Sequence, residues 1–268
     1  MQRILNVIKD AFDPRDRSVA PNRAGSSVQV SFRDKVAYIK DQGQAGSCTA
    51  HAGTEMLELL FRKQRSNLSL SIDRSALRFS PLFLYARERI AEGSFTQDAG
   101  ADSRTIFRVL AEEGCCLETE DAYFDNKLFV LPTAAQVADA AQFKIGAYHR
   151  IWDIETAKTV LVSGYTFTVG MPVFMQMESQ EAAETGMIRV PTPGQTNVGG
   201  HEMHVVGCDD SKQVFGETGA FEVQNSWGTD WGDHGFCWIP YRYFHVELAW
   251  DFWTAHFGGP WIPAKGGA

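Results

Sequence analysis

The sequence predicts an α+β fold, because helical patterns fill the first part of the chain and strand patterns fill the second. Up to about residue 164, apolar residues recur at helical spacing between capping residues. Beyond Gly164, short β-branched and aromatic runs alternate with Gly, Pro, Asn and Asp. Helices followed by strands are typical of two packed lobes. A chain of 268 residues is long enough to bury a substantial core.

The chain begins with a polar segment. Residues 1–27 are charged, contain proline and glycine, and show no sustained period. We therefore expect a flexible leader or a short pro-segment there, followed by one domain over residues 28–268. The helical lobe of that domain is expected over about 40–150 and its β-rich lobe over about 150–255.

Start and stop signals divide these lobes into elements. Helices are expected over residues 47–65, 80–93, 102–114, 132–143 and 153–164, and strands over 165–177, 187–190, 203–208, 220–227 and 235–240. The apolar residues of the first helix recur on one face of an otherwise polar sequence. Pro81 stands in the first turn of the second helix and Gly93 beyond its end, while Asp102 or Ser103 caps the third.

The overall composition excludes several classes of function. The formal net charge is -8, and this acidic balance argues against a nucleic-acid partner, whose phosphates require a basic face. The sequence contains no run of about 18 apolar residues and no basic-then-apolar leader. It therefore predicts neither a membrane span nor a secretory signal.

The cysteines favour a reducing compartment. There are five, an odd number, and two of them are adjacent. Adjacent cysteines rarely bridge each other, and the spacings show no disulfide framework. We therefore favour a cytoplasmic location and assign four cysteines to packing: Cys115, Cys116, Cys208 and Cys237. Nothing in the sequence predicts the oligomeric state.

The remaining cysteine, Cys48, is either a nucleophile or a small buried thiol. It stands in "QGQAGSCTAHAG", in the first turn of an expected helix, where free N–H groups and the positive end of the helix dipole favour a thiolate. Ala45 and Gly46 leave room for a substrate backbone. Against this, cysteines are among the most buried residues, and most of them only pack. The local sequence leaves both interpretations open.

Of the seven histidines, His201 is best placed to partner a thiol. It follows two glycines at the start of an apolar strand, in "GGHEMHVVGC". His204 lies three residues further along, so the two imidazoles are expected on opposite faces of the strand. The pattern is one residue short of the zinc motif HExxH, and a strand would not bring both rings to one ion. We therefore expect no metal site.

A third polar group ends a later strand, in "FEVQNSWGTDWG". The side-chain carbonyl of Asn225 could hold an imidazole in one tautomer, with Trp227 covering that bond from water. The alternative is a turn made by Asn, Ser and Gly, with the tryptophans in the core.

Together these three stretches resemble the papain-like cysteine peptidases. The family has Gln six residues before a Cys at a helix start, then a His ahead of an apolar strand that contains Val-Gly, then Asn-Ser-Trp-Gly. Here the elements stand in the same order as Gln42 with Cys48, His201 ahead of "VVGC", and residues 225–228. The resemblance covers residues from about 28 to 253.

The resemblance implies the papain-like fold, in which a helical lobe and an antiparallel β-barrel lobe enclose the active-site cleft. It implies that Cys48 is the thiolate, and that His201 is its ion-pair partner and later the acid for the leaving amine. Asn225 would orient His201, while Gln42 and the backbone N–H of Cys48 would form the oxyanion hole.

The resemblance also implies a substrate-binding surface. Gly100 matches the glycine whose backbone pairs with the substrate, and Trp227 would edge the leaving-group side. Gly170 matches the floor of the pocket for the substrate residue two before the scissile bond. On the wall of that pocket, Glu202 stands where the family usually has Ala, and a carboxylate there would favour Lys or Arg in the substrate. The alternative is that Glu202 faces solvent or an arginine.

The expected function is that of a cysteine endopeptidase, which hydrolyses a peptide or protein substrate through an acyl-enzyme on Cys48 and needs no cofactor. One alternative is that the same groups transfer the acyl group to an amine or act on an isopeptide bond. The other is a catalytically silent binding module, which would not need the complete set of groups. The leader is too short for the long helical propeptide of lysosomal members, but it could cross the cleft as a short latch.

Overall fold

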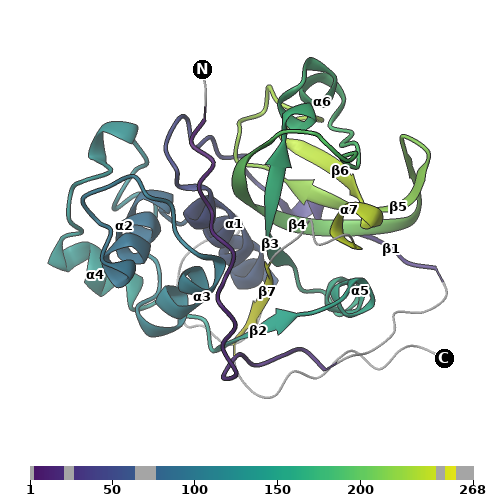
Figure 1. The fold of residues 1–268 in the computed structure, drawn as a ribbon. Helices are drawn as coiled ribbons and strands as arrows, with labels where there is room; N and C mark the ends of the chain where they lie inside the picture. The colour runs from purple at the N-terminus through teal and green to yellow at the C-terminus, as the bar shows by residue number, and fades with distance from the viewer. Residues whose placement is uncertain (1–2, 21–26, 64–76, 246–250, 258–268) are drawn as a thin grey trace.

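The computed structural model of the chain describes residues 3–20, 27–63, 77–245 and 251–257. It shows a helical lobe and a β-rich lobe side by side (Figure 1), as the sequence predicts for an α+β fold. Each lobe has a large apolar cluster of its own. No helix in these ranges is long and apolar enough to cross a membrane.

The helical lobe contains α1 (Cys48–Lys63), α2 (Pro81–Glu92), α3 (Ser103–Glu112), the 3-10 helix η3 (Asp125–Lys127) and α4 (Ala134–Ala140). The predicted end of α2 at Gly93 and the predicted cap of α3 at Asp102 are confirmed. Ser80 accepts a hydrogen bond from the backbone of Phe83, and Gly93 ends α2 in the left-handed conformation with φ 73°. Asp102 accepts one from the backbone of Thr105 and so caps α3.

Helix α1 is enclosed more completely than its sequence suggests. The sequence predicts one apolar face, which would leave the other face exposed. In the structure every residue from Cys48 to Phe61 is buried. Buried Glu58 of this helix has a partner, since Lys40 Nζ lies 3.1 Å from its Oε1, whereas neither carboxylate oxygen of Glu55 has a hydrogen-bond partner among the described residues. The helix therefore lies at the centre of the molecule, and its N-terminus opens between the lobes.

The β-rich lobe contains β1 (Gln29–Ser31), η1 (Arg33–Lys35), β2 (Ala147–Ile151), α5 (Ile154–Val162), β3 (Phe167–Phe174), η4 (Met175–Glu178), α6 (Gln180–Thr185), β4 (Asn197–Val214), β5 (Glu217–Gln224), β6 (Phe236–Pro240), α7 (Tyr241–His245) and β7 (Asp251–His256). In the described part of the chain, the strands form one seven-stranded antiparallel sheet. Its order is β2-β7-β3-β4-β5-β6, with β1 pairing to β4. The β3–β4 register places Gly170 opposite Glu202 and Met171 opposite His201.

Several parts of the sheet differ from the prediction, among them β2, which was not expected. The expected strand over 187–190 was wrong, since only Met187 forms an isolated bridge, to Trp238 of β6. Strand β7 was not expected at all, and it pairs with both β2 and β3. Trp253 of β7 belongs to the apolar cluster of the helical lobe, so this strand joins the two cores.

Residues 3–20, called the N-terminal segment below, run in extended form between the two lobes (Figure 1). Isolated parallel bridges join Asn6 to Gly200 and Ile8 to Asp102. The part of the expected leader that the structure describes is thus hydrogen-bonded to both lobes.

Candidate active site

Cys48 is the first residue of α1, and its side chain is completely buried. Burial raises the pKa of the Cys48 thiol to about 12, although the backbone N–H of Glu202 faces the sulfur and lowers the pKa in part. Ser47, directly before the helix, has its Oγ 2.8 Å from the Tyr123 hydroxyl. The raised pKa means that the Cys48 thiol is neutral in this structure.

His201 of β4 is held by a single hydrogen bond. Its Nε2 lies 2.8 Å from Asn225 Oδ1. The same Oδ1 accepts from the backbone N–H of Ser226, which fixes the orientation of the amide. His201 Nε2 is consequently the donor, and Nδ1 carries the lone pair. This Nδ1 is buried without a hydrogen-bond partner among the described residues.

The surroundings keep His201 uncharged in this state. Burial lowers the pKa of His201 to about 4, and the hydrogen bond to Asn225 offsets only part of that shift. Trp227 stacks on the imidazole with ring centroids 5.0 Å apart, and Trp231 packs edge-on against Trp227. The two indoles exclude water from the His201–Asn225 hydrogen bond.

Gln42 is oriented by residues that the sequence analysis did not identify. Ser226 Oγ donates to Gln42 Oε1 over 2.8 Å, and Gln42 Nε2 donates to the carbonyl of Ala45 over 2.8 Å. The Tyr123 hydroxyl lies 2.9 Å from the Gln42 carbonyl oxygen, to which it donates. Ser226 follows Asn225 directly and could have been found from its motif, but Tyr123 lies 81 residues away from Gln42 and carries no local signal.

The residues expected to bind substrate lie along the same groove. Gly100 has φ 74°, and a Cβ there would lie 2.5 Å from Asn6 Oδ1. A Cβ on Gly170 would lie 2.8 Å from Glu202 Oε2. Glu202 is completely buried, so the expectation that it faces either solvent or an arginine is not met.

His204 differs from His201 because both of its ring nitrogens have hydrogen-bond partners. It is as buried as His201, but Nδ1 lies 3.1 Å from Gln224 Oε1 and Nε2 lies 2.8 Å from Thr166 Oγ1. Both nitrogens therefore have partners, as expected for a residue on the opposite face of the strand.

The beginning of the N-terminal segment lies over these residues. The Arg3 guanidinium lies 4.5 Å from the centroid of the Trp227 ring. Leu5 accepts from the backbone N–H of Gly200, whose carbonyl accepts from Val7 N–H, each over 3.2 Å. Asn6 Nδ2 donates to the carbonyl of Asp98 over 3.0 Å. The groove is thus filled from the Trp227 end toward Gly170.

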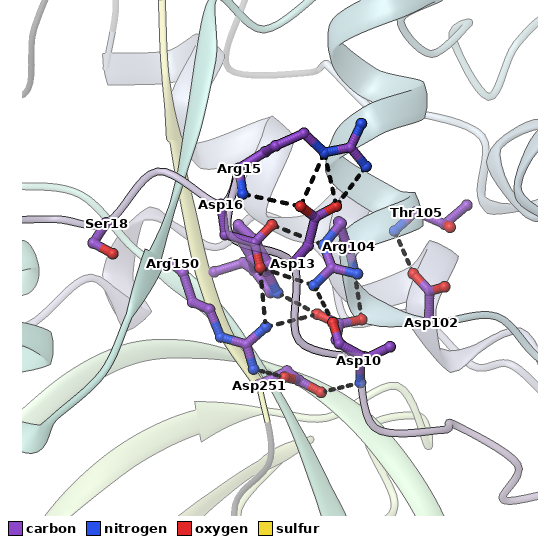
Figure 2. A network of polar contacts seen from close by, with 12 residues as sticks. Asp10, Asp13, Arg15, Asp16, Ser18, Asp102, Arg104, Thr105, Arg150 and Asp251 are labelled. Atoms are coloured by element: carbon purple, nitrogen blue, oxygen red, sulfur yellow. Dashed lines mark hydrogen bonds and ion pairs between the residues drawn. The ribbon is translucent and has the colours of Figure 1, made fainter.

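The remainder of the segment is held by buried charges (Figure 2). Asp10 Oδ2 accepts from Trp253 Nε1 at 2.8 Å and from Arg150 Nη1 at 3.3 Å. Arg150 also pairs with Asp251 of β7. Arg104 of α3 donates to both carboxylate oxygens of Asp16, at 2.9 and 2.8 Å. These contacts fasten the segment to both lobes.

Comparison with known proteins identifies the family. Residues 98–249, more than half of the chain, match the model of the papain family cysteine protease. The chain belongs to the papain family. An uncharacterised peptidase C1-like protein of Acanthamoeba polyphaga mimivirus is 33% identical over 223 residues, which make up 80% of this chain and 68% of that protein. Cathepsin L1 of Drosophila melanogaster is 29% identical over 81% of this chain and 55% of its own length.

Solved structures agree with this assignment. Xylellain, a cysteine protease from Xylella fastidiosa, superposes with a TM-score of 0.84 at 28% identity, over 97% of this chain and 98% of its own. Procathepsin B S9 from Trypanosoma congolense shares the fold, with a TM-score of 0.69 at 16% identity over 93% of this chain and 87% of its own. This papain-family member is a cysteine peptidase, and its substrate is a protein or peptide.

Proposed function

We propose that this papain-family member is an endopeptidase that works through Cys48, His201 and Asn225 with a covalent acyl-enzyme. The observation that carries the proposal is the state of the His201 imidazole. Its Nε2–H is fixed on Asn225, while Nδ1 has a lone pair and no hydrogen-bond partner among the described residues. The backbone N–H of Glu202, the residue directly after His201, faces the Cys48 sulfur, which brings this part of β4 to the thiol. A buried nitrogen without a partner on the preceding residue is suited to take the thiol proton.

In the proposed reaction, the Cys48 proton moves to His201 Nδ1 and the thiolate attacks the scissile carbonyl carbon. The carbonyl oxygen becomes an oxyanion, which would be stabilised by the backbone N–H of Cys48 and the second N–H of the Gln42 amide. Collapse of this intermediate breaks the C–N bond, and His201 gives its proton to the leaving amine. Water, deprotonated by His201, then hydrolyses the thioester and returns the proton to Cys48.

We further propose that the N-terminal segment keeps the enzyme closed. From Arg3 to Val7 the segment runs from the expected leaving-group side, at Trp227, toward the expected acyl side, at Gly170. A substrate would run in the opposite direction. The segment therefore fills the groove without presenting a peptide bond in the orientation for cleavage, and its cover keeps Cys48 and His201 uncharged.

Single-turnover hydrolysis of a mixed peptide library, analysed by mass spectrometry, tests the endopeptidase function. We expect internal cleavage, a transient thioester on Cys48, and loss of both in Cys48→Ala. In His201→Ala the thioester should form at least about a thousandfold more slowly, since the general base is removed. Transfer of the acyl group to an added amine in preference to water would contradict hydrolysis as the function.

A further inference from the structure

Val7 of the N-terminal segment occupies a small pocket next to Gly170. Its side chain is buried, and its Cγ1 would lie 3.7 Å from a Cβ built on Gly170. The same Cβ would lie 2.8 Å from Glu202 Oε2 and 2.9 Å from Ser103 Oγ. Because Gly170 has no side chain, the Glu202 carboxylate and Val7 both lie against it, and the place that Val7 occupies borders on that carboxylate.

The Glu202 carboxylate is only half satisfied. Oε2 accepts from Ser103 Oγ at 2.5 Å, in the first turn of α3. Oε1 is buried and has no hydrogen-bond partner among the described residues. Thr168 faces the same carboxylate, but its hydroxyl also lacks a partner of standard geometry. A buried carboxylate oxygen without a hydrogen-bond donor destabilises the folded protein. A side chain that brings a donor to Oε1 would remove this cost.

The groups that act on Glu202 are mainly other carboxyl groups. Burial raises the pKa of Glu202 well above its ordinary value, and Asp10 and Asp251, which pair with Arg150, raise it further. Glu88, which is buried on α2, also interacts with Glu202. The Glu202 carboxyl is therefore neutral without a partner, and a cation at Oε1 would favour its ionised form.

We infer that Glu202 is the specificity-determining residue of this pocket, and that it selects Lys or Arg as the substrate residue two before the scissile bond. The inference rests on the proposed function, because it assigns the pocket to a substrate. An ammonium or guanidinium group supplies the donor that Oε1 lacks, whereas an apolar side chain leaves it unpaired. If Glu202 only stabilised the start of α3, it would need just Oε2, which already accepts from Ser103. The second oxygen, Oε1, would have no role.

Since Val7 fills the pocket in the intact chain, the inference can be tested without any substrate. Val7→Lys and Val7→Met place an unbranched charged or neutral side chain in the pocket, and each is made in the native and the Glu202→Gln background. The readout is the rate of iodoacetamide alkylation of Cys48 at pH 7.5, located by mass spectrometry. Thermal unfolding of all four proteins verifies that they are folded.

With Glu202 present, Val7→Lys should protect Cys48 as well as Val7→Met does, within about threefold. In the Glu202→Gln background, Cys48 should be alkylated at least about tenfold faster in the Val7→Lys variant than in the Val7→Met variant, since the ammonium loses its partner. Ile8→Lys is the matched control. Because Ile8 is 70% exposed, Ile8→Lys should change the rate of Cys48 alkylation by the same factor in both backgrounds. A ratio of Lys to Met rates that is the same in both backgrounds would overturn the inference.

A substrate measurement separates this inference from the proposed function. Peptides that differ only by Lys or norleucine two residues before the scissile bond are compared for kcat/KM with the native enzyme and Glu202→Gln. We expect the native enzyme to prefer Lys at least about tenfold and the variant to lose that preference. Protection of Cys48 by Val7→Lys without cleavage of either peptide would contradict the peptidase but support the pocket, whereas cleavage of both at equal rates would contradict the pocket alone.

Discussion

The two ends of the N-terminal segment are held in different ways. Residues 3–8 lie on the groove through backbone hydrogen bonds, one asparagine side chain and a guanidinium stacked on an indole. Residues 10–20 are fastened mainly by ion pairs to Arg104 of α3 and Arg150 of β2, and by hydrogen bonds of Asp10 with β7. The part that covers Cys48 is thus separate from the part that holds the segment in place. Release can be controlled at the ion pairs without altering the catalytic groups.

The ion pairs are unbalanced in charge. In the part of the chain that the structure describes, two guanidinium groups, of Arg104 and Arg150, meet three carboxylates, of Asp10, Asp16 and Asp251. Burial and the nearby Asp251 carboxylate raise the pKa of Asp10 to about 7, against the hydrogen bonds from Arg104 N–H and Trp253. A proton on Asp10 restores neutrality, so docking of the segment is linked to pH.

Complete removal of the segment should give the largest effect. We expect a chain that lacks residues 1–20 to hydrolyse peptides at least about a hundredfold faster than the intact chain, because Cys48 is completely buried in the intact chain and the segment is bonded to Gly200 and Asp102 on the two sides of the proposed groove. Initial rates on one peptide measure the effect, with active-site titration to count competent enzyme. Equal rates per active site in the two proteins would show that the segment does not inhibit.

Loss of the Asp10 carboxylate should release the segment almost as well. Asp10→Ala leaves Trp253 Nε1 without its acceptor and removes one of the three carboxylates around Arg150, and loss of a buried charged partner costs about 3–5 kcal/mol. Alkylation of Cys48 should accelerate at least about a hundredfold. Asp13→Ala is the matched control, since Asp13 pairs with exposed Arg15 inside the segment and should leave the rate unchanged. Equal effects of the two substitutions would contradict the assignment.

The pH dependence should have a defined sign. The pKa of Asp10 is raised from 3.8 to about 7 in the docked state, so docking is most stable below the ordinary value and weakens as pH rises to about 7. Burial raises the pKa of Asp251 in the same direction. The undocked population of the segment, measured by native-state proteolysis of the segment, should rise with pH. The rise should be at most tenfold per pH unit for each proton released.

Asp10→Asn should flatten that profile between pH 5 and 8, because its neutral side chain imitates the protonated carboxyl. Asp251 retains its own smaller contribution, so we expect a shallower slope and not a horizontal line. Release that becomes easier toward acid pH in the native protein would reverse the sign and contradict the charge argument.

The smallest effect is expected at the other end of the segment. Arg3→Ala removes the contact of this half-buried side chain with Trp227, and a cation–π contact that keeps part of its solvation contributes about 0.5–1 kcal/mol. Alkylation of Cys48 should then rise only about two- to fivefold. An effect of Arg3→Ala as large as that of Asp10→Ala would mean that both ends hold the segment equally.

Local sequence predicted much of the fold and the order of the site residues. Asp102 marked the start of α3 because its hydrogen bond reaches only three residues along the chain. The placement of Asn225 beside His201 followed from the family resemblance, and the structure gives it a 2.8 Å hydrogen bond. Their roles in catalysis stay a prediction.

Features that depend on distant residues were not predictable. The Asp10–Arg150 pair joins residues 140 positions apart, and neither residue lies in a pattern that marks its partner. The burial of Glu202 also depends on Val7, which belongs to a segment without any period. Strand β7 was missed because its pairing with β2 and β3, rather than its own sequence, makes it a strand.

The most direct test is the rate of Cys48 alkylation by iodoacetamide from pH 4 to 9, in the intact chain, in the chain that lacks residues 1–20, and in that shorter chain with His201→Ala. We predict slow alkylation in the intact chain. The shorter chain should react rapidly down to well below the free-thiol pKa of about 8.5, and His201→Ala should abolish that plateau. Alkylation of the folded shorter chain that rises only near the free-thiol value, with or without His201, would contradict the account.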